Sequence, residues 1–305
     1  MNLEIETANW SEHRELLRAI RQRVFIQEQN VPEELEWDAE DASAVHFIAR
    51  DGKRPVGCAR LLSNGYFGRM AVLPEYRHQS WGTRLLRAVE HHYEKEMRGR
   101  ILRASVQTQA YGFYHHNGFS PETEFCWDAG IPHVRMSKVL GRSSQGSEQF
   151  MPGKDNEVYV LEQPAAAEGI LQIASQFAPA AINFCIADLN HPLWSDKTTL
   201  SCLNRYLRGA RQRSIRILIA REYPGIADHP LLQLQQRMSS RIQLQVHSAV
   251  DINLVLMTPA AFIRIERNKV TACMNDRPTV ARQMEKFQEW WRSSQPCKEG
   301  RRLGL

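Results

Sequence analysis

The sequence lacks the features by which membrane and secreted proteins are usually recognised. Its 305 residues contain no apolar run of about 18 residues, so no transmembrane helix is expected. The N-terminal stretch MNLEIETANWSEHRE is acidic and polar, unlike a secretory or transit peptide, which predicts a cytoplasmic protein. The six cysteines form no C-x-x-C pair, and we expect buried thiols in a reducing compartment.

Patterns that bind metal ions are also scarce. The eleven histidines include two doublets, His91-His92 and His115-His116. Neighbouring residues of a helix point about 100° apart, so a doublet makes a poor chelate. We therefore expect no metal ion in this protein.

The composition is that of an ordinary globular protein, 43% hydrophobic and 24% charged, and the length suits two domains. The net charge of +5 is uneven: residues 1–140 hold 18 Lys+Arg and 19 Asp+Glu, whereas residues 141–305 hold 21 and 15. The second half therefore carries +6, which permits an anionic ligand such as a nucleic acid there. A solvated basic surface explains the same charge.

The division of the chain is indicated by residues 141–156, GRSSQGSEQFMPGKDN, which lack apolar periodicity and are typical of a linker. We expect one domain over 1–140 and a second over 157–305. Periodicity and turn residues in the first domain predict a mixed α/β fold. Its expected helices are 11–26, 82–97 and 109–116, and its expected strands are 44–50, 55–62, 67–73, 101–107, 123–128 and 133–139.

The second half alternates strands and helices more regularly, which predicts an α/β domain with a largely parallel sheet and crossover helices. Its expected strands are 157–162, 181–187, 214–220, 241–247, 252–257 and 261–266, the last two forming a hairpin. Its expected helices are 164–178, 196–212, 229–239 and 277–293. The last helix carries one apolar face, made of Val280, Met284, Phe287 and Trp291.

The stretch YRHQSWGTRLL, residues 76–86, joins an expected strand to an expected helix. The free N–H groups and partial positive charge of a helix N-terminus favour an anion, and Arg77 stands beside them. Gly82 lets the backbone approach a ligand closely. A phosphate loop usually carries more than one glycine, so this turn alone is a weak signal.

Four blocks, in order, give this turn a context. RHQSWG, at residues 77–82, resembles the R-x-x-G/A-x-G pyrophosphate loop of the GNAT acetyltransferase superfamily, and AYGFYHHNGF resembles its A-x-x-FY-x-x-x-GF helix. EFCWDAGIPHVRM and RQRVFIQEQNVPEELEWDAED resemble the closing and N-terminal blocks of the small ElaA-like bacterial branch. The blocks lie within residues 3–138. The resemblance implies a GNAT α+β fold with a mixed central sheet, which transfers an acetyl group from acetyl-CoA to an amine.

The resemblance also implies how the co-substrate is held. Backbone atoms of Ala71 and Val72 would bind the pantetheine arm along a strand that splays from its neighbour. Arg77 and the following turn would hold the pyrophosphate, with contributions from Gln79, Ser80, Trp81, Gly82 and Thr83. The acceptor amine must be neutral to attack the thioester, so a base or a water relay is needed.

Candidate catalytic residues follow from the same blocks. Tyr114 matches the tyrosine that protonates the leaving thiolate in the family, and we predict it as the general acid. His133 and Asp128 are the candidate bases. The N-terminal signature supplies candidates for the acceptor pocket, namely Glu28, Asp38, Asp41 and His46. Trp10 and Trp37 fit the same pocket, although core packing is the preferred interpretation.

Two positions depart from the loop pattern. Ser80 stands where the family has its first glycine, and a positive φ there would add about 1 kcal/mol of strain. If the position is helical, serine is harmless and its hydroxyl can bond a phosphate oxygen, which is our expectation. Trp81 is large for its place and either covers the co-substrate or packs beneath the helix.

The second half resembles one half of a phospholipase D-like domain with a mixed sheet. The catalytic pattern H-x-K-x-x-x-x-D of that family falls on Asp251, Asn253 and Thr258, so the nucleophilic histidine and the phosphate-binding lysine are both missing. The resemblance implies a non-catalytic domain that regulates, dimerises or binds an anion. Asp188 and Asn190 lie at a strand end where α/β ligands often bind, but a structural turn is their expected role.

Three functions are compatible with these observations. The leading one is an acetyl-CoA-dependent N-acetyltransferase with an appended non-catalytic domain and an unidentified acceptor. An acyl-homoserine-lactone-type synthase shares the fold and a similar start, but the DAGIPHVRM block and the A-x-x-FY helix argue against it. A module that senses acetyl-CoA or nucleic acid without turnover is the third.

Overall fold

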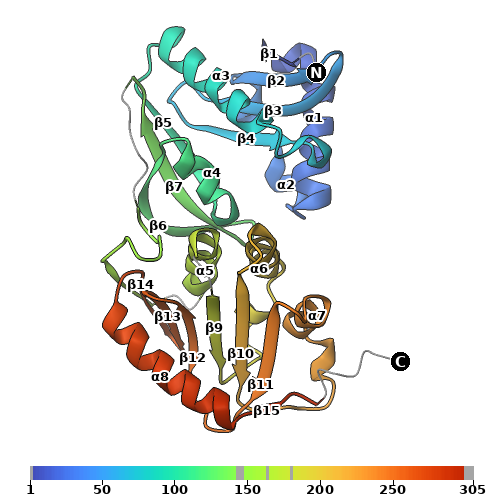
Figure 1. Ribbon diagram of the computed structural model, residues 1–305. Helices are drawn as coiled ribbons and strands as arrows, with labels where there is room; N and C mark the ends of the chain where they lie inside the picture. Colours follow the sequence, from blue (N-terminus) through green and yellow to red (C-terminus); the bar gives the residue numbers. More distant parts are fainter. Residues whose placement is uncertain (1–2, 142–147, 163–164, 179–180, 299–305) are drawn as a thin grey trace. The chain divides into compact units, whose positions relative to one another are not determined.

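The computed structural model describes residues 3–141, 148–162, 165–178 and 181–298 (Figure 1). The chain divides into two compact units. The first consists of Met1–Gln107 and Phe113–Ser147, and the second of Thr108–Gly112 and Glu148–Leu305. A short segment from the first half of the sequence therefore belongs to the second unit.

The first unit contains the expected helices and strands, together with elements that periodicity does not predict. A strand precedes the first helix, and that helix continues as a π-helix, η1. In chain order the elements are β1 (Leu3–Ala8), α1 (Trp10–Arg21), η1 (Gln22–Glu28), α2 (Glu33–Glu36), η2 (Ala39–Ala42), β2 (Val45–Asp51), β3 (Arg54–Leu61), β4 (Phe67–Val72), η3 (Pro74–Tyr76), α3 (Trp81–Lys95), β5 (Ile101–Gln107), α4 (Tyr111–His116), β6 (Ser120–Asp128) and β7 (Ile131–Val139).

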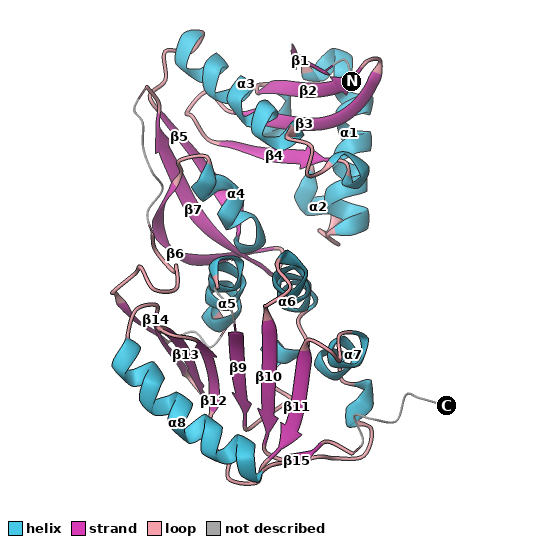
Figure 2. Cartoon of the chain, viewed as in Figure 1, coloured by secondary structure: helices cyan, strands magenta, loops and turns pink. Residues whose placement is uncertain are grey.

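These strands form two antiparallel sheets, one in the order β1-β2-β3-β4 and one in the order β5-β7-β6. Between β4 and β5, the described residues show a single parallel bridge, Tyr66 to Arg103, beside a 2.9 Å hydrogen bond from Arg103 N to Gly65 O. The two strands diverge from that point (Figure 2). The backbone of β4 therefore has an open edge, which is the feature that positions the candidate site.

The four-stranded sheet is covered on both faces. On one face, Leu17 and Ile20 of α1 pack in a cluster with Ile48 and Ala71. On the other face, the ring of Phe47 meets His92 of α3 edge-on, with ring centroids 5.5 Å apart. Successive strand residues point to opposite faces, so one short sheet buries two helices.

The second unit also contains every expected element, plus two strands that the pattern does not predict, β14 and β15. In chain order the elements are η4 (Thr108–Ala110), β8 (Val158–Leu161), α5 (Ala166–Phe177), β9 (Ala181–Ile186), η5 (Pro192–Trp194), α6 (Lys197–Gly209), β10 (Ser214–Ile219), η6 (Ile226–Asp228), α7 (Pro230–Arg237), β11 (Ile242–Val246), β12 (Asn253–Met257), β13 (Ala261–Glu266), β14 (Lys269–Cys273), α8 (Arg277–Ser293) and β15 (Gln295–Pro296).

The sheet of the second unit is mixed, in the order β15-β11-β10-β9-β12-β13-β14-β8. Only β9, β10 and β11 pair in parallel, whereas the remaining pairings in the described chain are antiparallel. The expectation of a largely parallel sheet is therefore wrong for most of the strands. The reason is that β12, β13 and β14 follow one another through tight turns, which can join only antiparallel neighbours. The expected β12–β13 hairpin is present.

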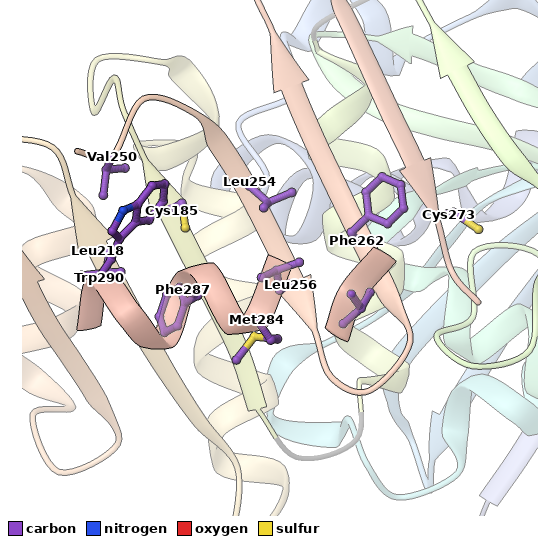
Figure 3. Close-up of a cluster of buried hydrophobic side chains, with 11 residues drawn as sticks. Cys185, Leu218, Val250, Leu254, Leu256, Phe262, Cys273, Met284, Phe287 and Trp290 are labelled. Carbon is purple, nitrogen blue, oxygen red and sulfur yellow. The ribbon is translucent and has the colours of Figure 1, made fainter. Parts of the chain in front are cut away.

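Helix α8 covers one face of this sheet. Val280, Met284, Phe287 and Trp290 pack against strand residues such as Leu254 (Figure 3). Trp290 is buried in this cluster, whereas the expected Trp291 is only partly buried and stacks on Phe287 at 5.5 Å. A 17-residue helix has more than one residue near the edge of its apolar face. Periodicity therefore predicts which residue lies at that edge only to within one position.

The expected linker is not uniformly a linker. Residues 142–147 lie outside the described part of the chain, but Phe150 and Met151 are buried in the second unit.

Five of the six free cysteines are buried and Cys126 is partly exposed. Within the described ranges, no helix combines the length and hydropathy of a membrane span.

Candidate active site

The open strand β4 is also irregular. Its pairing with β3 shifts between Cys58 and Arg60, which is a β-bulge, and Arg69 sits in it with φ +49°. A bulge bends a strand and re-aims its neighbouring groups, and bulges are frequent beside active sites. The expected pantetheine-binding residues, Ala71 and Val72, follow this bulge and pair on their other side with β3.

Arg77 links two other residues that the sequence marked. Its Nε donates to the carbonyl of Val72 at 2.9 Å, and its two Nη atoms donate to the two carboxylate oxygens of Glu28, each at 2.6 Å. The side chains of Arg77 and Glu28 are 33% and 39% exposed. The structure thus brings Glu28, expected in the acceptor pocket, to the expected pyrophosphate loop.

The backbone of Ser80 differs from our expectation. Its φ is +64° and ψ is 7°, in the left-handed region, and it caps α3 without a side-chain hydrogen bond. The expectation of a helical serine is therefore wrong, because the backbone at this position turns through the left-handed region that favours glycine. His78 is also left-handed, with φ +62°. Each such residue costs about 1–2 kcal/mol relative to a right-handed one.

The loop leads directly into α3. The first intrahelical bond of this region runs from Arg84 N to the carbonyl of Ser80 at 3.0 Å, so the preceding amides of Gly82 and Thr83 have no partner within the helix. A Cβ at Gly82 would stand 3.5 Å from the ring of Phe113, an ordinary contact. Gln79 donates its side-chain amide to the carbonyl of Glu75 at 3.1 Å.

Trp81 packs beneath the helix rather than over a ligand. Its side chain is 1% exposed, and its ring meets that of Tyr76 edge-on at 6.0 Å. Of the two roles left open for Trp81, the structure favours the second. A contribution of this residue to co-substrate binding would have to come from its backbone.

Tyr114 lies on α4 beside the bulged strand. Its hydroxyl contacts the sulfur of Met70 in β4 at 3.7 Å, and its ring packs against Phe67 and Phe119. Burial raises the pKa of Tyr114, so the phenol is protonated at neutral pH. A neutral phenol next to the open edge of β4 is a suitable proton donor.

His133 and Asp128 lie on the neighbouring strands β7 and β6. His133 is 8% exposed, and its Nδ1 lies 2.8 Å from the carbonyl of Ile131. A carbonyl only accepts, so Nδ1 carries the proton and Nε2 keeps its lone pair. Burial lowers the pKa of His133, although the charge of Asp128 opposes the shift. Asp128 itself is exposed at the end of β6.

The acidic signature folds into a buried ion-pair network that sequence reasoning missed. Arg21, 1% exposed, donates from Nε to Glu36 Oε1 at 2.5 Å and from Nη1 to Asp41 Oδ1 at 2.7 Å. Arg60 donates to Asp38 at 2.5 Å and to Asp41 at 2.9 Å. Asp41 is therefore a buried bridge between two arginines.

A third arginine, Arg69 in the bulge, completes this network. It reaches Asp38 at 3.1 Å and Glu36 at 3.3 Å. Burial opposes ionisation of Asp38, but the hydrogen bond and charge of Arg60 lower its pKa. Burial of Glu36 outweighs its arginine partners and raises its pKa. The network ties the signature directly to the bulged strand.

His46 and the two tryptophans also belong to this region. His46 is buried, its Nε2 lies 2.9 Å from the carbonyl of Asp41, and its ring stacks on Trp10. Burial lowers the pKa of His46. The guanidinium of Arg21 lies 5.6 Å from the Trp10 ring and 4.8 Å from the Trp37 ring. The preferred interpretation of both tryptophans as packing residues agrees with this arrangement.

A separate hollow of about 430 Å³ lies over α3 and the end of β7. Its charged lining is largely self-paired, because Glu90 accepts from Lys138 at 2.7 Å and from Arg87 at 2.9 Å. The hollow does not include the open edge of β4, so it is not the candidate site. Among the described residues, no group of three or more His, Cys, Asp or Glu is placed to hold a metal ion.

The marked residues of the second unit lie in turns or at the start of a strand. Asp188 Oδ1 accepts from Asn190 N at 3.0 Å, directly after β9. Asn253 Oδ1 accepts from the backbone N–H groups of Ala187 and Asp188, at 2.9 and 3.1 Å. Asp251 is exposed and lies 3.9 Å from Lys286. These bonds satisfy backbone donors at a strand end, as expected for a structural turn.

Comparison with known proteins identifies each half separately. Residues 10–140 match the family model for an acetyltransferase (GNAT) domain, and residues 162–303 match a domain of unknown function, DUF7931. The uncharacterized N-acetyltransferase YjcF of Bacillus subtilis is 39% identical over 125 residues, which cover 39% of this chain and 87% of that protein. The protein YyaT of the same organism is 32% identical over 149 residues, which cover 47% of this chain and 99% of that protein.

Solved structures resemble the same half. Escherichia coli ElaA has a TM-score of 0.41 and 26% identity, covering 44% of this chain and 99% of that one. An acyl-CoA N-acyltransferase from Pseudomonas aeruginosa has a TM-score of 0.42 and 25% identity, covering 45% of this chain and all of that one. The family model and the sequence relatives establish the assignment: through residues 10–140, the chain belongs to the GNAT acetyltransferase family.

Proposed function

We propose that the protein is an N-acetyltransferase that moves the acetyl group of acetyl-CoA to an amine. Membership of the GNAT family supports acyl transfer, and the choice of acetyl and of the amine belongs to the proposal. The observation that carries it is the open, bulged strand β4, which has the partly buried hydroxyl of Tyr114 3.7 Å from the sulfur of Met70. A phenol beside β4 supports the role of Tyr114 as the acid for a thiolate that leaves from a thioester bound along this strand.

The residues of the loop suit the pyrophosphate of CoA. The first amides of α3 have no helical partner, and the left-handed residues His78 and Ser80 turn the backbone in the manner of an anion-binding nest. In this proposal residues 79–83 hold the pyrophosphate and Ala71 with Val72 hold the pantetheine. Arg77 joins them only if Glu28 releases it, because Glu28 binds both of its Nη atoms.

Bound acetyl-CoA supplies an activated acyl thioester, and the chain supplies the proton transfers. The amine nitrogen bonds to the acyl carbon and gives up one proton, for which Nε2 of neutral His133 is the proposed acceptor. The C–S bond breaks, and Tyr114 gives its proton to the departing thiolate. The proton held by His133 then returns to Tyr114 through solvent, so that charge and protons balance.

The proposal does not specify the acceptor amine, and the ion-pair network removes one argument for a cationic acceptor. Acidic residues in the signature would suit a cationic acceptor, but Asp38 and Asp41 are already paired with arginines. We therefore do not derive a cationic substrate from them. Substrate roles for Glu28, Asp38, Asp41 and His46 remain predictions.

We also propose that the second domain is non-catalytic. The positions of a phospholipase D-like pattern carry Asp251, Asn253 and Thr258, and Asn253 spends its amide oxygen on two backbone N–H groups. The phospholipase D-like relationship itself remains a hypothesis. Binding of an anionic ligand to this basic domain is likewise a hypothesis.

The test is thiol release by the full-length chain, given acetyl-CoA with a panel of amines, peptides and aminoglycosides. We expect turnover with at least one acceptor and an approximately hundredfold lower kcat for Tyr114→Phe, within the range for loss of a general acid. Tyr66→Phe serves as the matched control. Tight acetyl-CoA binding without turnover on any acceptor would replace this proposal by a sensing module, and preference for longer acyl groups would correct the donor.

A further inference from the structure

Helix α4, which carries Tyr114, begins in one compact unit and ends in the other. Its first two residues, Tyr111 and Gly112, belong with η4 to the second unit, and Phe113 onward belongs to the first. Tyr114 follows Gly112 by two residues, about 3 Å along the helix axis. Whatever holds Gly112 therefore also restrains Tyr114 through one helical turn.

Gln176 of α5 holds this turn with both ends of its side-chain amide. Its Nε2 donates to the carbonyl of Thr108 at 3.0 Å, and its Oε1 accepts from the N–H of Gly112 at 3.0 Å. Thr108 and Gly112 are four residues apart, which is the spacing of acceptor and donor in an α-helix. The amide of Gln176 is bonded to both groups and caps the helix from a distant part of the sequence.

A second glutamine of α5 fixes the same segment in the interior. Thr108 and Gln172 are both 0% exposed, and the hydroxyl of Thr108 donates to Gln172 Oε1. Gln172 Nε2 donates in turn to Thr199 at 3.1 Å and to Asp196 at 3.3 Å. Every polar atom of the Gln172 side chain thus has a partner, which gives the support of η4 a defined geometry.

Two features show that α4 depends on this support. The helix has six residues, and helices so short do not hold their shape in water without tertiary contacts. Gly112 leaves room for the close approach of Gln176, because a Cβ there would stand 2.7 Å from Gln176 Oε1 and the amide would have to shift. The glycine has ordinary helical neighbours, so this contact rather than backbone conformation accounts for it.

We propose that Gln176 is a positioning residue for acyl transfer: it fixes the first turn of α4 and thereby holds the hydroxyl of Tyr114 against β4. The inference rests on the proposed function, because it gives the appended domain a role in the reaction of Tyr114.

The test compares full-length Gln176→Met with the unaltered chain. Methionine keeps the length of glutamine but loses the bonds to Thr108 and Gly112, together with a third bond to the carbonyl of Gln172 in its own helix. We expect kcat to fall about tenfold while KM for acetyl-CoA changes less than twofold. Gln233→Ala is the control, since Gln233 is an exposed glutamine of α7 that donates to Asp228 O and touches no part of α4. Gly112→Ala is a second variant, which displaces the amide of Gln176 while favouring helix.

A double-mutant cycle separates positioning from general destabilisation. In a Tyr114→Phe background, Gln176→Met should lower kcat no further, because the group that it positions is gone. Equal kcat for Gln176→Met and the unaltered chain, or an undiminished loss in the Tyr114→Phe background, would overturn the proposal.

Amide hydrogen exchange provides a readout that needs no turnover. Gln176→Met should speed exchange of Gly112 and Phe113 at least tenfold and leave the amides of β2 unchanged. Unchanged exchange at Gly112 would refute the cap. If Tyr114→Phe alone retains full activity, the general-acid assignment fails and the catalytic part of this inference falls with it, while exchange still decides whether Gln176 fixes α4.

Discussion

Two arginines of the acetyltransferase domain bind the acids of one signature in opposite ways. Arg21 is 1% exposed and donates to Glu36 and Asp41 in the interior. Arg77 is about one-third exposed and grips Glu28 with two bonds of 2.6 Å near the surface. The bond lengths are similar, so the difference between the pairs lies in their surroundings.

Burial decides what each pair does. A charge left alone in the interior cannot recover its hydration, so breaking a buried pair costs about 3–5 kcal/mol. An exposed pair is worth about 0–1 kcal/mol, because water and salt compete for both ions. The Arg21 pair is therefore a fixed part of the interior. The Arg77–Glu28 pair is weaker, and in the proposed function a phosphate takes the place of Glu28 on Arg77.

The largest effect is expected from Arg21→Met. The variant leaves Glu36 and Asp41 buried with fewer partners, and we expect a loss of about 3–5 kcal/mol in the free energy of unfolding. Urea denaturation measures it. Arg18→Met is the control, since Arg18 pairs with Glu33 at 3.8 Å on the surface and should lose less than about 1 kcal/mol. Equal losses in the two variants would remove the distinction between buried and exposed pairs.

The pH dependence of kcat/KM tests His133, which is buried like Arg21. Burial lowers its pKa from the usual 6.5, so the imidazole is neutral at pH 7 and can act as a base. It becomes protonated only in more acidic solution. We expect kcat/KM to fall with decreasing pH below about 6.5. Stability contributed by His133 is lost in the same direction, because the unfolded chain binds the proton more readily.

His133→Gln should lower kcat by about 10–100-fold and abolish this acid limb, with turnover measured between pH 5 and 8. His191→Gln is the control, because burial lowers the pKa of His191 as well, yet it lies in the second unit. Persistence of the limb in His133→Gln would assign the base elsewhere, with Asp128 the next candidate.

Much of the fold was predictable because periodicity reports burial. Helix α8 and strand β5 have the expected bounds, since each presents one regular apolar face. Strand β14 was not predicted. Arg267 and Asn268, which form the turn between β13 and β14, suggested that the sheet ended with the β12–β13 hairpin instead of continuing into a third antiparallel strand. Short edge strands such as β15 have too few residues to show any period.

The candidate site was predictable only in part, because its partners are distant in sequence. The acids of the signature were interpreted as a pocket for substrate, whereas the structure pairs Asp38 and Asp41 with arginines beside β4. Arg60 and Arg69 follow Asp38 by 22 and 31 residues, and no local pattern reveals that they neutralise it. The clamp of Gln176 on Gly112, 64 residues apart, is hidden for the same reason.

Ser80 provides a smaller test, on the exposed side of the comparison. Its φ of +64° costs a serine about 1–2 kcal/mol, so Ser80→Gly should stabilise the chain by about 1 kcal/mol after the greater entropy loss of glycine. Thermal and urea unfolding measure the change. Ser43→Gly is the control, since Ser43 has φ −105° and should lose stability instead. A loss of acetyl-CoA affinity in Ser80→Gly alone would show that the hydroxyl contributes a phosphate contact.

The smallest effect is expected from Glu28→Gln, which tests whether the exposed pair is exchangeable. Glutamine keeps the shape but removes the charge that competes with pyrophosphate for Arg77, so acetyl-CoA should bind a few-fold more tightly. That change corresponds to less than about 1 kcal/mol, the value of an exposed pair. Titration calorimetry at low and high salt measures it, and the advantage should shrink as salt screens the pair.

Glu75→Gln is the matched control, because Glu75 lies beside the same loop but pairs with Arg23 and Arg54. If both variants tighten binding equally, a general loss of negative charge explains the effect and the contact with Arg77 does not. If Glu28→Gln weakens binding, Glu28 orients Arg77 for the phosphate instead of competing with it. In that case the exposed pair has a structural role like the buried one. Burial alone then does not decide which arginine is free to bind a ligand.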